Sequence, residues 1–230
     1  MPFRTLAILL LAITSFAAEL PPPSAGDAEK WEKSIAKFEE SDQKNPPPKN
    51  GILFIGSSSI RGWKTLAQDF PDLPVYNRGF GGSQIADSVL FADRIVIPYQ
   101  PRQIVMFAGS NDVNAGKTSE QVLADFIEFD RVVRAKLPKT RISWIAITPC
   151  FKRWSQVDKV KKANRLVRAY CEQRSHLDYI NTADHMLAPD GMPRPDIFVA
   201  DGLHLNAKGY AIWTKIVRPF LKRPAARAAR

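Results

Sequence analysis

Short apolar runs alternate with longer amphipathic segments along most of the chain, and this alternation constrains the fold more than any other feature. Residues 104–108 are apolar at every position, which is typical of a strand buried on both faces of a sheet. The segments between such runs carry apolar residues at helical spacing. Strands and helices in alternation predict a parallel sheet covered by helices on both faces. We therefore expect one α/β domain, a three-layer α/β/α sandwich.

The pattern predicts a regular succession of elements in the region 51–220. Strands are expected at 51–55, 75–77, 103–108 and 141–147, with a weaker strand near 179–180. Helices are expected at 59–68, 85–95, 119–137, 156–173 and 206–220. Sheets of this kind bind ligands where the loops leave the carboxyl ends of the strands. The residues that follow each strand are therefore the first candidates for a site.

The first fifty residues carry a different pattern. Residues 1–17 combine a basic start with a short apolar run at 6–13 and small residues before a possible cleavage after Ala17. These features predict a secretory signal peptide, because the run is short for a membrane span; an uncleaved anchor is the alternative. Residues 18–50 are expected to form a proline-containing linker and a helix at 28–42 that packs outside the core. We therefore expect an exported protein, periplasmic or extracellular.

The formal net charge of +10 allows binding to nucleic acid, to an anionic surface or to an acidic polysaccharide. The basic residues are scattered, however, and one cluster lies in the tail 221–230, which we expect to be disordered. The sequence contains no recognition-helix, zinc-finger or stacking-aromatic pattern, so we expect no nucleic-acid partner. No second long apolar run occurs, so we also expect no stable membrane insertion after cleavage of the signal peptide.

The two cysteines, Cys150 and Cys171, leave two alternatives open. In an oxidising compartment they could form a disulfide. Cys171 also falls in a helical pattern, where a buried free thiol is the ordinary alternative. The sequence does not decide between them, because the geometry of the two side chains does.

Polar or glycine-rich turns follow the expected strands and precede the last helix. They are Gly56-Ser57-Ser58-Ser59, Gly79-Phe80-Gly81-Gly82, Gly109-Ser110-Asn111-Asp112 and Asp201-Gly202-Leu203-His204. Each has an ordinary structural explanation, since serine and asparagine cap helices and glycine allows tight turns. Their co-occurrence favours a functional site.

Serine hydrolysis requires a hydroxyl, a base that takes its proton, a carboxylate that orients the base, and donors for the developing oxyanion. The chain contains three histidines, His176, His185 and His204. Of these, His204 alone has an acid three residues earlier, Asp201, and at this spacing both side chains of one tight turn can point toward the same cleft. No histidine-rich ligand spacing occurs, so we expect no metal and no cofactor.

The chain has no Gly-x-Ser-x-Gly elbow, which argues against the α/β-hydrolase arrangement. The four turns, in the order serine, glycine, asparagine and histidine, instead resemble the blocks of the SGNH hydrolases, which are GDSL-type esterases and acylhydrolases. The resemblance extends over most of the region 51–220 and identifies it as an SGNH hydrolase domain. It implies a flavodoxin-like three-layer sandwich with a parallel five-stranded sheet.

The resemblance also implies a role for each block. The nucleophile falls on Ser58, with His204 as the general base and Asp201 as the carboxylate that orients it. The backbone N–H groups of Ser58 and Gly82, together with the side-chain amide of Asn111, would form the oxyanion hole.

One position departs from the family pattern. The family usually has aspartate between the glycine of the first block and the nucleophile, and this chain has Ser57 there. We expect the missing charge to alter the stability of the turn and the pH profile. Ser57 and Ser59 are the less favoured candidates for the nucleophile.

The residues expected to line the substrate pocket combine aromatic and basic side chains: Arg61, Trp63, Arg78, Phe80 and the loop 149–154. Such a lining suits a sugar ring or an acidic substituent, although solvated arginines and packed tryptophans are the commoner case. The sequence shows no long apolar segment that could form the lid of a triglyceride lipase. We therefore expect a secreted serine ester hydrolase that removes short acyl groups, such as acetyl, from a small-molecule or polysaccharide ester.

Two alternatives remain open. An acyltransferase would use the same chemistry to move the acyl group to a sugar hydroxyl. A non-catalytic carbohydrate- or anion-binding protein would use the serines as helix caps, and Asp201 and His204 to hold a turn. The oligomeric state is also left open.

Overall fold

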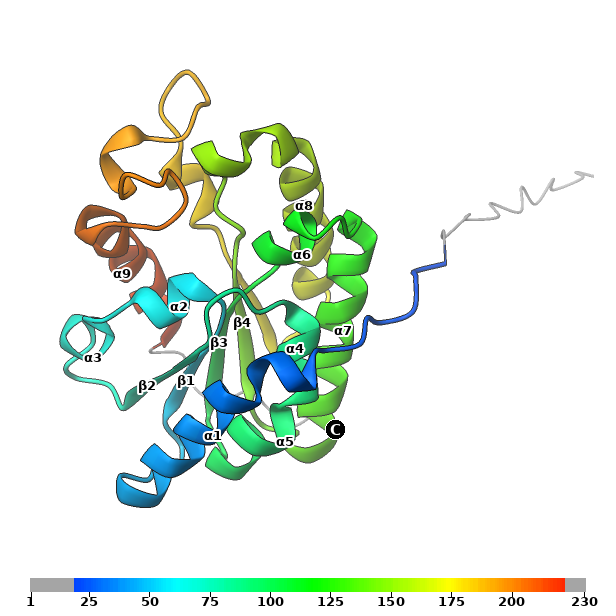
Figure 1. Ribbon diagram of the computed structural model, residues 1–230, viewed down its shortest axis with the longest axis vertical. Helices are drawn as coiled ribbons and strands as arrows, with labels where there is room; N and C mark the ends of the chain where they lie inside the picture. Colours follow the sequence, from blue (N-terminus) through cyan, green and yellow to red (C-terminus); the bar gives the residue numbers. More distant parts are fainter. Residues whose placement is uncertain (1–18, 222–230) are drawn as a thin grey trace, which may run out of the picture.

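The computed structural model describes residues 19–221 and shows a parallel sheet between two layers of helices (Figure 1). The strands are β1 (Ile52–Gly56), β2 (Val75–Gly79), β3 (Gln103–Phe107), β4 (Arg141–Ile145) and β5 (Leu177–Ile180). They lie in the order β2-β1-β3-β4-β5, and every neighbouring pair is parallel. This is the strand order of flavodoxin-like sheets. The predicted α/β sandwich with a five-stranded parallel sheet is therefore confirmed.

The two ends of the chain are outside this description. The predicted signal peptide, residues 1–17, lies outside the described residues, and so does the predicted tail from residue 222 onward. Leu221, which the prediction placed in the tail, is instead the last residue of helix α9 (Ala207–Leu221), and its side chain is fully buried. Among residues 19–221 no helix is both long and apolar enough to cross a bilayer.

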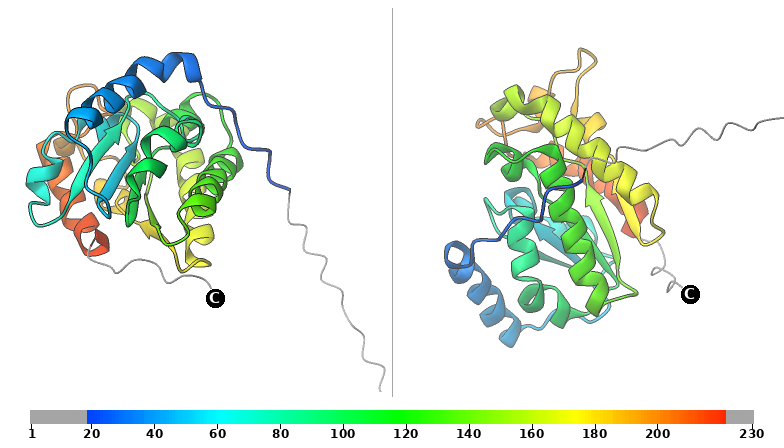
Figure 2. Two further views of the ribbon diagram at one scale, coloured as in Figure 1. Left: turned by 90° about the horizontal axis from the view of Figure 1, so that it is seen from below. Right: turned by 90° about the vertical axis from the view of Figure 1, so that its right-hand side faces the viewer.

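The helices cover both faces of the sheet (Figure 2). One layer contains α1 (Ala28–Lys44), α4 (Ile85–Leu90), α5 (Ala92–Ile95), α7 (Ser119–Lys136) and α8 (Val157–Glu172). The other contains α2 (Ser58–Gly62), α3 (Leu66–Asp69) and α9. The remaining elements are short: α6 (Ser110–Asn114) and the 3-10 helices η1 (Ile97–Tyr99), η2 (Phe151–Gln156), η3 (Ala183–Met186) and η4 (Pro195–Ile197). Alternate residues of each strand belong to opposite cores, as the two-residue period of a strand requires.

Strands β1, β2 and β3 end in register. Gly56 is aligned with Gly79 of β2 and with Phe107 of β3, so the loops that follow leave the same edge of the sheet. Gly56 has a φ of +131°, and a Cβ there would lie 2.0 Å from the Phe107 carbonyl oxygen. Only glycine allows the chain to turn at this point. A hydrogen bond from the Ser57 N–H to the same carbonyl (3.0 Å) then holds the serine turn against the end of β3.

Two predicted helices are interrupted in the structure. The helix expected at 59–68 is divided into α2 and α3, because Trp63 leaves the helical conformation (φ −76°, ψ 74°) and buries its ring. Its indole Nε1 donates to Asp69 at 2.6 Å. The helix expected at 85–95 is divided at Phe91 into α4 and α5. Helix α6 and the 3-10 helices were not predicted, because elements this short show no periodic pattern.

Helix α1 is part of the hydrophobic core, so the prediction that it packs outside the core is wrong. Trp31 and Ile35 are 8% and 0% exposed and belong to the core of the first layer. The Trp31 ring meets Phe80 edge to face, with ring centroids 5.5 Å apart. Residues four apart share one face of a helix, so Trp31 and Ile35 form a single apolar face that packs on the core.

Replacing Trp31 by alanine should lower the free energy of unfolding by about 3–5 kcal/mol, the usual cost of truncating a buried aromatic side chain. Urea denaturation followed by circular dichroism measures this change. The matched control is Lys33→Ala, an exposed position of the same helix, for which we expect a change within about 0.5 kcal/mol. An unchanged unfolding midpoint for Trp31→Ala would show that α1 does not support the core.

Cys150 and Cys171 are free thiols in the structure, and both are buried. Of the two alternatives that the sequence left open, this agrees with the buried free thiol. Burial raises the pKa of Cys171 to about 12, so this thiol is not ionised at neutral pH and is a poor nucleophile.

Candidate active site

Ser58, His204 and Asp201 form a chain of hydrogen bonds at the carboxyl edge of the sheet. Ser58 is the first residue of α2, and His204 lies 146 residues further along, in the loop before α9. The Ser58 hydroxyl oxygen lies 2.9 Å from His204 Nε2. On the other side of the ring, His204 Nδ1 lies 2.5 Å from Asp201 Oδ2. The fold therefore brings together the three residues to which the resemblance assigns Ser-His-Asp chemistry.

A tight turn aims the Asp201 carboxylate at the imidazole. Asp201 Oδ1 accepts hydrogen bonds from the backbone N–H groups of Leu203 (2.8 Å) and His204 (2.9 Å), a common way for aspartate to close a turn. Gly202 supplies the left-handed residue of the turn, with φ +62°. Partial burial tends to raise the pKa of Asp201, but the hydrogen bonds from His204 and Leu203 outweigh it and lower the pKa to about 2. The carboxylate is therefore ionised at neutral and mildly acidic pH.

The serine turn is fastened to the segment that carries His204. Tyr210 of α9 donates a hydrogen bond from its hydroxyl to the Ser59 carbonyl oxygen, at 2.8 Å. Tyr210 follows closely after His204 in the chain, so this bond limits relative movement of the base and the hydroxyl. As the first residue of α2, Ser58 has a backbone N–H with no intrahelical acceptor, and this N–H is available to a ligand.

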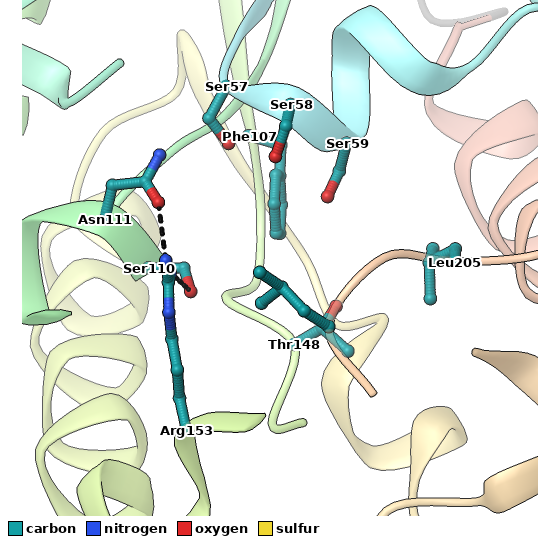
Figure 3. Close-up of a pocket in the computed structure, with 10 residues that line it drawn as sticks. Ser57, Ser58, Ser59, Phe107, Ser110, Asn111, Thr148, Arg153 and Leu205 are labelled. Atoms are coloured by element: carbon teal, nitrogen blue, oxygen red, sulfur yellow. Dashed lines mark hydrogen bonds between the residues drawn. The ribbon is translucent and has the colours of Figure 1, made fainter. Parts of the chain in front are cut away.

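Asn111 of α6 lies across the cavity from Ser58 (Figure 3). Its Nδ2 donates to the Ser83 carbonyl oxygen at 2.9 Å, which uses one of the two N–H groups of the amide. Its Oδ1 accepts a hydrogen bond from Arg153, also at 2.9 Å. These two bonds fix the orientation of the amide, and its nitrogen lies on the side of the serine turn.

Gly82 lies between β2 and α4 and has a φ of +93°. It does not line the cavity around Ser58. The carbonyl oxygen of its neighbour Ser83 accepts a hydrogen bond from Asn111, and this bond keeps the loop between β2 and α4 beside the site. The contribution of the Gly82 N–H to the oxyanion hole stays a prediction.

A buried ionic network holds α6 against the start of α4. Asp112 is fully buried and accepts a hydrogen bond from the Ile85 N–H at 3.2 Å. Lys117 Nζ lies 3.0 Å from Asp112 and 2.7 Å from Asp125. The network therefore positions the turn that carries Asn111. The sequence alone does not show this network, because Ile85 of α4 and Asp125 of α7, which Lys117 links to Asp112, come near Asp112 only in the folded chain.

A small, partly open cavity lies beside Ser58. Its lining comes from the end of β3, from the segments that follow β1, β3 and β4, and from the loop before α9: Ser57, Ser58, Ser59, Phe107, Ser110, Asn111, Thr148, Arg153, Leu203 and Leu205. Its enclosed volume of about 20 Å³ lies far below the usual range of small-molecule sites. In the part of the chain that the structure describes, no three acidic, histidine or cysteine side chains are grouped so that they could hold a metal ion.

Residues 54–212 match the GDSL-like Lipase/Acylhydrolase family, and this range includes all of the site residues described above. The chain belongs to this family. It is therefore an ester-bond hydrolase, and the resemblance to GDSL-type hydrolases is confirmed. A search of the curated proteins finds no match.

Solved structures of low sequence identity share the GDSL-like fold. A GDSL-like lipase from Bacteroides thetaiotaomicron is 17% identical with a TM-score of 0.70, and the match covers 82% of this chain and 97% of that one. A carbohydrate esterase family 3 from Talaromyces cellulolyticus is 18% identical with a TM-score of 0.59, and the match covers 74% and 95%. At these identities the likeness supports the fold.

Most residues predicted to line the pocket of this GDSL-like hydrolase do not line it. Trp63 and Phe80 are each 1% exposed and pack in the two cores. Arg78 is buried and pairs with Asp42. Arg61 lines a separate hollow beside Phe80. The prediction is therefore wrong for these positions, and for Trp63 and Phe80 the alternative of packed aromatic side chains is correct.

Arg153 is the residue of the predicted loop 149–154 that lines the cavity. Sequence reasoning did not propose Thr148, Phe107 or Leu205 as lining residues. No pattern in the sequence separates these residues from other buried ones, because only the packing of the loops turns them toward Ser58.

Ser57, at the position where the GDSL-like family usually has aspartate, is the N-cap of α2 but makes no side-chain cap hydrogen bond. It is 3% exposed and lines the cavity. The turn is therefore held by backbone hydrogen bonds, and the effect of Ser57 on the pH profile stays a prediction.

Proposed function

We propose that this chain is an exported serine esterase that removes short acyl groups, acetyl foremost, from a sugar or polysaccharide. The hydrogen-bond chain from Ser58 through His204 to Asp201 is the single observation that carries the proposal. It has the arrangement of nucleophile, base and orienting carboxylate on which serine hydrolases depend. Membership of the GDSL-like family supports the same chemistry.

In this mechanism His204 Nε2 takes the Ser58 proton as the hydroxyl oxygen attacks the ester carbonyl. Asp201, with a pKa of about 2, remains ionised, holds the Nδ1–H and stabilises the imidazolium that forms. The N–H groups of Ser58 and Gly82 and the Asn111 amide stabilise the negative charge on the carbonyl oxygen. His204 then gives the proton to the leaving alcohol, and water hydrolyses the acyl-enzyme by the same steps.

The preference for a short acyl group rests on the size and lining of the cavity. With an enclosed volume of about 20 Å³, the cavity leaves room for no more than a small acyl group beside Ser58. Phe107, Leu203 and Leu205 provide limited apolar surface there. A carbohydrate esterase and an acetyl esterase are among the solved structures that share the fold, so acetylated carbohydrates are the first substrates to test.

A chain-length series of p-nitrophenyl esters tests the proposed activity. We expect the largest kcat/KM for the acetate and a steady fall toward the octanoate, because the cavity has no room for a long chain. Acetate release from acetylated polysaccharides then tests the alcohol part. A maximum at the octanoate would contradict the short-acyl assignment, and no hydrolysis of any ester would contradict the serine esterase.

Export is the part of the proposal that rests on residues 1–17, whose pattern is that of a signal peptide. The test is N-terminal sequencing of the protein expressed at full length in a bacterial host. We expect a mature chain that begins after Ala17 and is released from the cytoplasm. An uncleaved chain that remains in the cytoplasmic fraction would contradict export.

Replacing Asn111 by alanine should lower kcat by about 10²–10³, the usual effect of removing one oxyanion donor. KM should change little, because the donor acts mainly on the charge that develops in the transition state. Steady-state kinetics with p-nitrophenyl acetate measures both constants. The matched control is Asn114→Ala in the same short helix, outside the cavity lining. A raised KM with unchanged kcat in Asn111→Ala would instead assign Asn111 to binding of the ground state.

A further inference from the structure

A positively charged side chain lines the cavity beside the proposed nucleophile. Arg153 lies on η2, in the loop that follows β4, and reaches across to α6 (Figure 3). Its Nη1 donates to Ser110 Oγ at 2.7 Å, and its Nη2 donates to Asn111 Oδ1 at 2.9 Å. Both acceptors are neutral. These bonds use two of the five N–H groups of a guanidinium.

Arg153 has no carboxylate within ion-pair distance among residues 19–221. Two other arginines shielded from solvent differ in this respect: Arg78 pairs with Asp42, and Arg141 lies 3.1 Å from Asp178. Burial lowers the pKa of the Arg153 guanidinium below its usual value. A partly buried charge without a counter-ion is costly. An anionic ligand would remove that cost.

Another polar group of the same cavity lacks a hydrogen-bond partner. Thr148 lies in the loop after β4 and is 8% exposed. Its Oγ1 is buried, and the described part of the protein provides no hydrogen-bond partner for it. Buried polar groups are normally hydrogen-bonded. The cavity therefore contains an uncompensated cation and an unused hydroxyl at the place where a substrate must bind.

We propose that the substrate of this esterase carries a carboxylate that binds Arg153, with Thr148 as a second polar contact. The substrate class is an acyl ester of an acidic sugar or polysaccharide. Arg153 contributes one uncompensated positive charge, which matches a monoanion, and the planar guanidinium suits the two oxygens of a carboxylate. The net charge of +10 favours the approach of an acidic polymer. The inference rests on the proposed serine esterase function and names its substrate class.

Two matched substrates test the inference: methyl glucuronoside and methyl glucoside, each acetylated at the same ring hydroxyls. They differ at the carboxylate, so the ratio of their kcat/KM values isolates its effect. We expect the wild-type protein to prefer the glucuronoside by roughly tenfold or more, the size of a charge-assisted hydrogen bond. Raised salt should reduce this preference, because it screens the charge.

Arg153→Gln should bring the ratio close to one. Arg153 also contacts Asn111, so this variant should lose turnover on both substrates, and the ratio separates this common loss from loss of carboxylate binding. Arg153→Lys should keep part of the preference, because it keeps the charge and loses the planar fork. The control is Lys152→Gln, a change of charge at the adjacent residue outside the cavity lining, which should leave the ratio unchanged.

Two results would overturn the inference. One is the absence of a wild-type preference for the glucuronoside, shown either by a ratio near one or by hydrolysis of p-nitrophenyl acetate without hydrolysis of either sugar ester. The other is a preference that survives in Arg153→Gln. Both leave the serine esterase intact, whereas absence of all ester hydrolysis would contradict the proposed function itself.

Discussion

Ser58→Ala should lower kcat toward p-nitrophenyl acetate by about 10⁶, the effect of removing the nucleophile of a serine hydrolase. Alanine has no hydroxyl to attack the carbonyl, and His204 Nε2, 2.9 Å from the Ser58 oxygen in the structure, then has no proton to accept. The residual rate would come from binding and the oxyanion donors alone. Steady-state assays at high enzyme concentration measure the residual kcat. Circular dichroism checks that the variant is folded.

The neighbouring serines provide matched controls. Ser57→Ala and Ser59→Ala change residues that line the same cavity, but neither hydroxyl is hydrogen-bonded to His204, so both variants should keep most of the activity. A serine-directed organophosphonate should label the wild-type protein at Ser58 and leave Ser58→Ala unlabelled. Near-normal turnover in Ser58→Ala, or a label on Ser57 or Ser59, would assign the nucleophile to a neighbour.

His204→Ala should lower kcat by a similar factor, about 10⁶, because nucleophile and base act as a unit. Without the imidazole, nothing takes the Ser58 proton as the hydroxyl attacks. The same argument predicts that the double variant Ser58→Ala/His204→Ala is no slower than either single variant. The measurement is a double-mutant cycle in kcat with p-nitrophenyl acetate.

The other two histidines show whether the loss is specific. His185 is exposed, and His185→Ala should be almost fully active. His176 also contacts a carboxylate, Asp130 at 3.0 Å, but no serine hydroxyl completes that pair, so His176→Ala should affect stability more than turnover. Losses that multiply in the double variant would show that Ser58 and His204 act independently, which would contradict the mechanism.

The central strands β1 and β3 were predictable because each is buried on both faces. A strand such as β3, with every residue from Gln103 to Phe107 buried, shows its position as an apolar run whatever its neighbours are. The helix breaks at Trp63 and Phe91 were not predictable in this way. They depend on where a large ring finds space in a core built from several elements, and the periodic pattern of the segment itself does not show that.

The site was predictable in its local parts. The Asp201–His204 turn closes through hydrogen bonds between residues two and three positions apart, so its spacing could be recognised along the chain. The pocket lining was less predictable: Arg78 is held by Asp42, 36 residues away, and no local pattern distinguishes it from Arg153, which has no such partner. Whether an arginine is structural or available to a ligand depends on its three-dimensional neighbours.

The sequence by itself therefore determined the succession of elements, the turns after the strands and the types of residue available for chemistry. These depend on periodicity and on contacts within a few residues. Only the tertiary structure decided that the Ser58 hydroxyl meets an imidazole 146 residues away, that α1 completes the core, and that Arg153 lacks a counter-ion in the cavity. Such contacts join distant segments, and their positions follow from the packing of the whole chain.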